Sequence, residues 1–317
     1  MASLSQTLSD NPILRAELSH QQRGLASQKW RRWSVLFSLG LGVALLSSLS
    51  LMIALPQLSL LLRVPVRDLE EMLRGWFGTL TVMIGGLIMI HHLSFAVSAL
   101  QLASTSIARE KQGRTWESLL LTGVDARRIV YGKWWATMRT LWQAYRPLLV
   151  LRFALALWVG TLGATAQVTP FFTPPPLVYI VLIAVVTAIF PLSYAAFAGT
   201  LGILASLVVR SETTAYRVGT ALHFGTIVVS LSMVMLSFAL PFGDVDPTIV
   251  SLIPALFVTP LDGGMLAIIG INAGSGSASL YYLIGLFACM ALYAALTWAS
   301  LRGAQALTVR QRALPPI

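Results

Sequence analysis

VYIVLIAVVTAIFPLSYAAFAGTLGILASLVV, residues Val178–Val209, contains no charged side chain and is long enough to cross the hydrocarbon core of a bilayer. Lipid cannot hydrogen-bond to backbone N–H and C=O groups, so an apolar run of this length is expected to be helical. The composition of the 317-residue chain agrees, because 56% of its residues are hydrophobic and 11% are charged, whereas soluble domains carry about 25% charged residues. The sequence therefore predicts an all-α integral membrane protein, and it argues against a soluble enzyme, a nucleic-acid-binding domain and a disulfide scaffold.

Six apolar runs predict six transmembrane helices. They are Trp33–Leu55, Trp76–Thr105, about 147–166, Val178–Val209, Val218–Leu240 and Leu280–Leu301. Pro191 predicts a kink in the fourth helix. The third helix is expected to begin near Arg128, in water, and to bend at Pro147, because the aromatic residues between these positions suit the headgroup boundary.

The basic residues predict which side of the membrane each loop occupies. If the N-terminus is inside, 16 of the 22 lysines and arginines lie in cytoplasmic segments, three lie outside and three lie along the third helix. This asymmetry follows the positive-inside rule and predicts a multi-pass protein of the cell (inner) membrane with both termini in the cytoplasm. It also accounts for the net charge of +10 without a nucleic-acid partner.

Two further segments complete the predicted layout of a single transmembrane domain, residues 1–317. Residues 11–32 have spaced apolar positions among basic ones and predict an interfacial helix on the cytoplasmic surface, within the segment 1–32. Residues 248–271 are apolar, but prolines and glycines divide them into halves too short to cross, which predicts an external re-entrant hairpin between spans five and six. The remaining parts are spans one and two (33–105), a coupling region (106–133), spans three to six (134–301) and a cytoplasmic tail (302–317).

Ionisable residues inside predicted spans are candidates for a transport pathway, because a charge in hydrocarbon is costly. His91 and His92 lie near the middle of the second span, and hydrogen bonds to neighbouring helices would also explain them. Arg152 lies shortly after Pro147, where it could snorkel to the headgroups, bind an anionic cargo or pair with a helix-end carbonyl. The sequence contains no evident catalytic constellation and predicts no metal site, since the acids of the predicted external loop are dispersed.

The stretch SIAREKQGRTWESLLLTGVDARRIVYGK, residues Ser106–Lys133, predicts a second short helix in the cytoplasm. Gly113 permits a turn after the second span, Thr115 can cap a new helix, and Gly123 can end it. The predicted helix is Trp116–Thr122, and Trp116, Leu119 and Leu120 share one face of it because they have i, i+3 and i+4 spacing. An apolar face of this kind needs a partner, which can be a protein or the membrane surface.

This stretch resembles the coupling region of ABC-2-type transporter permeases. The pattern is ARE-x-x-G-x-T-x-E-x-L-L-x-T with G-K ten residues after the last Thr. The matching residues are Glu110, Gly113, Thr115, Glu117, Leu119, Leu120, Thr122, Gly132 and Lys133, and Trp116 lies within the same helix. A weaker match, Asn11-Pro12-Ile13-Leu14 with Glu17-Leu18, is similar to the start of one branch of these permeases, where an interfacial helix precedes the first span.

The resemblance implies the permease subunit of an ATP-driven exporter, coupled through the short helix to a separate ABC ATP-binding subunit. It further implies two copies of that subunit and a second permease, identical or homologous. ATP and Mg²⁺ would bind to the partner, because Gly132-Lys133 is followed here by Trp134 and completes no P-loop. This chain is then expected to be no enzyme and to bind no cofactor. The alternatives are an ATP-independent transporter or channel that uses His91, His92 and Arg152, and an assembly subunit without transport of its own.

Overall fold

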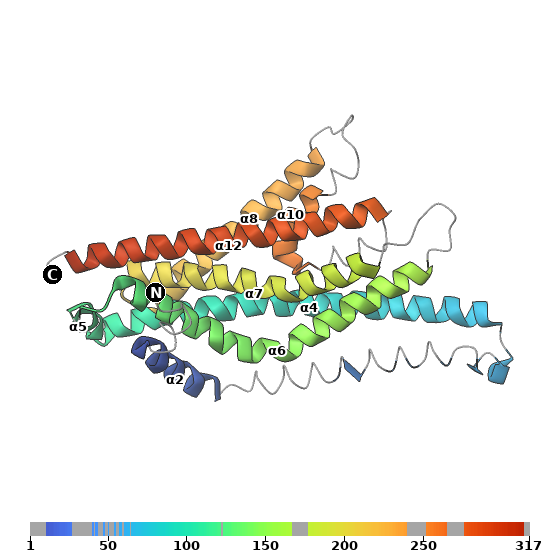
Figure 1. Cartoon of the computed structure of the whole chain (residues 1–317), viewed down its shortest axis with the longest axis horizontal. Coiled ribbons are helices and arrows are strands. Elements are labelled where there is room, and N and C mark those ends of the chain that lie inside the picture. Colours follow the sequence, from blue (N-terminus) through green and yellow to red (C-terminus); the bar gives the residue numbers. More distant parts are fainter. Residues whose placement is uncertain are drawn as a thin grey trace.

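The computed structural model describes residues 11–26, 65–121, 123–166, 177–239, 252–264 and 276–313, with scattered positions between 40 and 63. Within these ranges the chain is helical apart from short turns and contains no strand. The helices are α2 (Pro12–Ala26), α4 (Val66–Gln112), α5 (Thr115–Leu121), α6 (Ala126–Ala166), α7 (Leu177–Val208), α8 (Glu212–Ala239), α10 (Leu252–Asp262) and α12 (Gly276–Ala313). They form an elongated bundle (Figure 1).

Four segments of these helices are long and apolar enough to cross a membrane. They are Ile88–Gln112, Val178–Val208, Glu212–Leu236 and Leu283–Gln311, found among the described residues. For the described residues, the prediction of an all-helical chain is confirmed, with four helices that are long and apolar enough to cross a membrane. Six spans stay a prediction, since most of the first predicted span, Trp33–Leu55, lies outside the described residues and α6 is not among the four.

The helices extend past the apolar runs that predicted them. The second helix begins at Val66 rather than Trp76 and continues to Gln112, so its charged start is helical and not a loop. An apolar run in the sequence predicts only the part of a helix that lipid can surround. The helix itself can continue into water, because its backbone hydrogen bonds do not require lipid. The third helix begins at Ala126, close to the predicted Arg128, and contains Pro147. It bends near its middle, as Figure 1 shows.

Helix α7 lies at the centre of the bundle and contacts α4, α6, α8 and α12. It packs closely on α4 at Gly202, where an added Cβ would lie 2.6 Å from the carbonyl oxygen of Leu100. The buried Tyr145 of α6 donates its hydroxyl to the carbonyl of Ala188 in α7 over 2.7 Å. Small residues and satisfied hydroxyls therefore hold these helices together where lipid supplies no hydrophobic driving force.

Three elements meet at one end of the bundle, which we call the α5 end: α2, α5 and the last turns of α12 (Figure 1). Helix α2 packs on α6 and buries Leu14 and Leu18 there. It also buries the polar residues Glu17 and Gln21, which are 4% exposed. The predicted interfacial helix is therefore packed against protein along a partly polar face and does not rest only on a membrane surface.

Helix α10 is the described part of the predicted hairpin 248–271. It lies against α8 and α12 and also contacts α4 (Figure 1). The second half of that hairpin lies outside the described residues, so the re-entrant geometry stays a prediction.

Candidate functional site at the α5 end

Lys133 of α6 is the centre of a buried ionic cluster at the α5 end. Its side chain is fully buried, and its ammonium has three acceptors. It donates to the Oε2 of Glu17 over 3.0 Å, the Oε1 of Glu110 over 2.7 Å and the carbonyl of Ser106 over 3.1 Å. An ammonium group has three hydrogens, so each of its donors is paired despite complete burial. The cluster thereby ties α2, α4 and α6 together.

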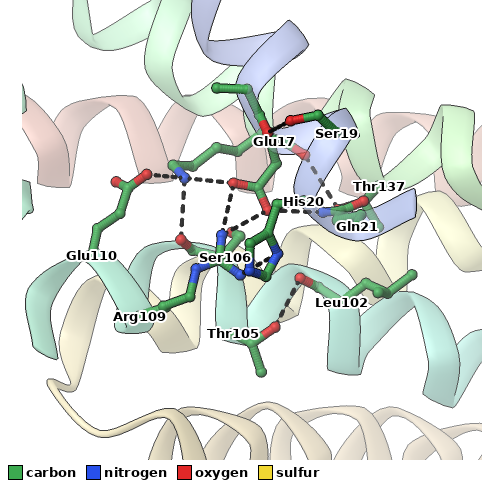
Figure 2. A network of polar contacts seen from close by, with 12 residues as sticks. Glu17, Ser19, His20, Gln21, Leu102, Thr105, Ser106, Arg109, Glu110 and Thr137 are labelled. Atoms are coloured by element: carbon green, nitrogen blue, oxygen red, sulfur yellow. Dashed lines mark hydrogen bonds and ion pairs between the residues drawn. The ribbon is translucent and has the colours of Figure 1, made fainter. Parts of the chain in front are cut away.

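Glu17 is the acidic residue that α2 contributes to this cluster. Burial raises the pKa of its carboxyl, but the nearby charges of Lys133 and Arg109 outweigh burial and hold the pKa below its usual value of 4.5. Arg109 lies 3.3 Å from the Oε2 of Glu17 and also contacts the Nδ1 of His20 over 2.9 Å. Gln21 donates to the Oε1 of Glu17 over 3.0 Å. The carboxylate is therefore ionised and held by three side chains (Figure 2).

Asn11 fixes the start of α2 over α6. Its Oδ1 accepts from the backbone N–H of Ile13 over 3.1 Å, which is an N-cap, and its amide donates to the carbonyl of Arg128 over 3.0 Å. A Cβ added at Gly132 would lie 2.8 Å from the amide nitrogen of Asn11, so glycine gives α2 room to approach. The two sequence segments that carry the family resemblance thus contact each other.

The short helix α5 follows a sharp turn at the end of α4. Gly113 has an ordinary φ of −76°, and the left-handed conformation falls on Arg114, with φ 58°. Thr115 donates its hydroxyl to the carbonyl of Glu110 over 3.2 Å, which joins α5 to the last turn of α4. Gly123, with φ 72°, lies just after the helix, as a helix-ending glycine commonly does. The predicted short helix is confirmed as α5, although it begins one residue earlier, at Thr115.

The Trp/Leu face of α5 is buried within the chain itself. Trp116 is 5% exposed and Leu120 7%, and they pack with Leu207 of α7 and Leu301 of α12. The indole of Trp116 donates to the Oε1 of Gln311 over 3.3 Å. The expectation that this face is displayed to a partner is therefore not met, because the ends of α7 and α12 cover it.

A different face of α5 is open to solvent. Glu117 and Ser118 are exposed, Leu119 is half-buried, and Leu121 is 86% exposed. Thr122, another predicted coupling residue, lies outside the described residues. Any partner that meets α5 in this structure would contact Glu117, Ser118 and Leu121.

The structure joins some of the predicted coupling residues and adds others. Glu110, Gly132 and Lys133 lie in the ionic cluster or at its edge, while Glu117 is an exposed residue of α5 outside the cluster. Sequence reasoning did not single out Asn11, Glu17 or Arg109 as site residues. The available signals were the weaker family match, which contains Asn11 and Glu17, and the place of Glu17 on a short amphipathic helix. The partner of Glu17 is 116 residues away.

The candidate pathway residues form a second polar centre, deep in the bundle. Arg152 is 4% exposed, and its guanidinium donates to the carbonyls of Ile88 in α4 over 3.1 Å and of Gly263 after α10 over 3.2 Å. It therefore does not snorkel to a surface. The Nε2 of His92 lies 3.0 Å from the carbonyl of Pro260, while the ring of His91 stacks on Phe95.

The end of α10 is fitted closely to this centre. Gly263 and Gly264 both have left-handed backbones, with φ 67° and 88°. An added Cβ at Gly263 would lie 2.9 Å from the ring of His92 and 3.0 Å from Arg152. The backbone N–H of Gly264 donates to the Oδ1 of Asp262 over 2.8 Å. Arg152 and His92 thus seat the C-terminal turn of α10 against α4 and α6.

No group of three metal-ligating side chains occurs in the part of the chain that the structure describes. A scan against protein-family models and a search of curated proteins found no match to this chain. Over the described residues the protein is helical apart from short turns, and four of its helices are long and apolar enough to cross a membrane.

Proposed function

We propose that this chain is the permease subunit of an ATP-driven ABC transporter of the ABC-2 type, an exporter of the cell (inner) membrane. It works with a second permease, identical or homologous, and with two copies of a separate ATP-binding subunit. That subunit binds ATP and Mg²⁺ and performs the hydrolysis. The α5 end, with both termini, lies in the cytoplasm, and six spans cross the bilayer.

One observation carries the proposal: the segments that resemble the family belong to a single contiguous structure. Glu17 lies in one segment, Glu110 and Lys133 lie in the other, and buried ion pairs join them. A chance likeness in two separate segments has no reason to be joined by a contact between residues 116 positions apart. The proposal therefore rests on the resemblance and on its physical coherence.

The geometry supports a direct mechanical role for α5. The helix follows α4 after two residues, and Lys133 ties the last turns of α4 to α6 and α2. The contact of Trp116 with Gln311 adds α12 to the helices that α5 touches. A displacement of α5 by an ATP-binding subunit would therefore move four helices together, because Lys133 and Trp116 join them through ion pairs and hydrogen bonds.

The test is co-purification of the full-length chain from its native membrane, followed by assay of ATP hydrolysis. We expect an ATPase with Walker motifs to accompany the chain. Leu121→Asp should reduce its recovery at least tenfold, because an exposed leucine at an interface would be replaced by a charge without a partner. Val309→Asp is the matched control, since it makes a similar change at another exposed residue of the α5 end.

Recovery of the ATPase with Leu121→Asp at the wild-type level would show that α5 is not the joint. A chain that transports cargo in vesicles without any ATPase would contradict the proposal and favour the ATP-independent alternative.

A further inference from the structure

The outward face of α6 carries two arginines for which the bundle supplies no acidic partner. Arg139 and Arg146 are exposed, two helical turns apart, and the exposed Gln143 lies between them. Neither guanidinium forms an ion pair with any described carboxylate, and the sequence of α6 contains no Asp or Glu. The stripe continues with Trp135, which is 40% exposed, and ends at Val150, which is 66% exposed.

In the orientation proposed above, with the α5 end in the cytoplasm, this stripe lies near the cytoplasmic edge of the bilayer. At 1.5 Å per residue, Arg139 and Arg146 lie about 9 and 20 Å along α6 from Lys133, which is joined to the last turns of α4. Both precede the bend at Pro147. The long arginine side chain can keep its stem against apolar surface while its charge extends toward the headgroups.

The aromatic residues of the stripe give an independent indication of the same depth. The guanidinium of Arg146 lies over the ring of Trp142, 5.6 Å from its centroid, and Trp135 projects from the same side of the helix. Tryptophan is enriched where the hydrocarbon core meets the headgroups, because its ring is apolar and its N–H can remain hydrated. Cationic and aromatic side chains therefore lie together on one face of α6, which is the combination expected near lipid phosphates.

We propose that the Arg139–Arg146 face of α6 is a binding site for the phosphate headgroup of an anionic membrane lipid. A diester phosphate supplies the negative charge that the protein lacks along α6, and guanidinium groups bind phosphate oxygens with two parallel hydrogen bonds. The acyl chains would lie along the apolar surface near Val150. The site is independent of ATP, of the partner subunit and of the transported cargo.

The experiment measures how strongly the purified full-length chain retains phosphatidylglycerol in nanodiscs that contain phosphatidylcholine and phosphatidylglycerol. Bound lipid is counted by native mass spectrometry, and the thermal unfolding midpoint is measured with and without the anionic lipid. Arg139→Gln and Arg146→Gln should each weaken retention about fivefold, and the double variant about 25-fold, because each basic residue near an anionic surface contributes about that factor. Both arginines are exposed, so the variants should fold normally.

Arg127→Gln is the matched control. Arg127 is an exposed arginine of the same helix and lies over the ring of Tyr131, 5.6 Å from its centroid, but it is outside the Arg139–Arg146 face. Its substitution should leave phosphatidylglycerol retention unchanged. Arg146→Lys should preserve most of the retention, because the charge remains within reach of the headgroup.

Three results would overturn the proposal. An equal loss with Arg127→Gln would mean that retention follows total charge and not this face. Equal stabilisation by soluble glycerol phosphate would mean that the site takes a free phosphate. Unchanged lipid retention together with loss of dimers in the Arg139/Arg146 double variant would assign the face to contact between copies of the chain.

Discussion

Lys133 carries a positive charge that has no contact with water, and two carboxylates depend on it. Removal of one member of a buried ion cluster leaves the other charges uncompensated, which costs about 3–5 kcal/mol. Lys133→Met keeps a similar side-chain length and should lower the free energy of unfolding by about that amount. The measurement is denaturant unfolding of the purified chain.

The control for Lys133→Met is a variant in which the two carboxylates that contact Lys133 are also neutralised. The triple variant with Lys133→Met, Glu17→Gln and Glu110→Gln removes all three charges and should recover part of the lost stability. If the triple variant recovers no stability, while Arg127→Ala leaves the free energy of unfolding unchanged, the volume of the Lys133 side chain and not its charge would account for the loss.

Glu17 predicts a dependence of stability on acid. Its pKa in the folded chain lies below the usual value of 4.5, because Lys133 and Arg109 favour the ionised form. Its contribution to stability is therefore fully present above pH 4.5 and is lost as the pH falls through the folded pKa. Glu17→Gln should flatten this loss in unfolding measured between pH 7 and pH 3. Glu117→Gln, which changes an exposed acid of α5, should retain the wild-type slope.

At this scale the sequence could identify single residues but not their pairings. Glu110 and Lys133 belong to a recognisable pattern, and the resemblance assigned them to the coupling region without indicating the ion pair between them. The pairing of Glu17 with Lys133 joins positions 116 apart, and the covering of Trp116 by Gln311 joins positions 195 apart. Such contacts depend on how the helices pack, which hydrophobic periodicity along one helix does not specify.

Among the elements, α10 is the one whose position depends most on its backbone. Gly263→Ala would place a Cβ in a left-handed conformation, 2.9 Å from His92 and 3.0 Å from Arg152. We expect a loss of about 1–3 kcal/mol, since strained left-handed residues cost that much and the neighbours are buried. Hydrogen exchange of residues 257–264 should accelerate as the turn leaves its seat.

Gly86→Ala is the control for this substitution. A Cβ at Gly86 would meet nothing within 4 Å, and alanine favours the helical conformation by roughly 0.5–1 kcal/mol over glycine. This variant should therefore be neutral or slightly more stable. Equal behaviour of the two variants would show that the seat of α10 tolerates a methyl group at Gly263.

Element identity was more predictable than element length. The apolar run Val178–Val209 matches α7 (Leu177–Val208) within one residue, because this helix is apolar over its whole length. The start of α4 and the end of α12 lie outside the predicted apolar runs. The turns there are polar, so hydropathy alone did not include them. The packing of α2 on α6 could not be predicted from composition. It depends on Gly132, where the missing side chain leaves room for Asn11.

For the whole molecule, the proposed orientation places three distant parts of the chain, all at the α5 end, on the same side of the membrane. Ser19 and Ser118 are exposed, and Val309 is 56% exposed, on α2, α5 and α12. Cysteine at each position should react with a membrane-impermeant maleimide only from the cytoplasmic side. The native Cys289 is buried and should give little background.

Leu61→Cys tests the other side of the membrane. This residue is 80% exposed and shortly precedes α4, whose start lies at the other end of the bundle from α5 (Figure 1). It should be labelled only from outside. Labelling of Ser118→Cys and Leu61→Cys from the same side would contradict a membrane-crossing α4 and the charge-based orientation.

The burial of Lys133 has a practical consequence for chemical footprinting. An amine-reactive ester acylates only an ammonium that water can reach and deprotonate, and the side chain of Lys133 is closed to solvent by Glu17 and its neighbours. Acylation of Lys133 therefore requires α2 to leave α6, even briefly. The rate of that reaction, followed by peptide mass spectrometry during turnover, would report how often this joint opens without a probe being engineered into the protein beforehand.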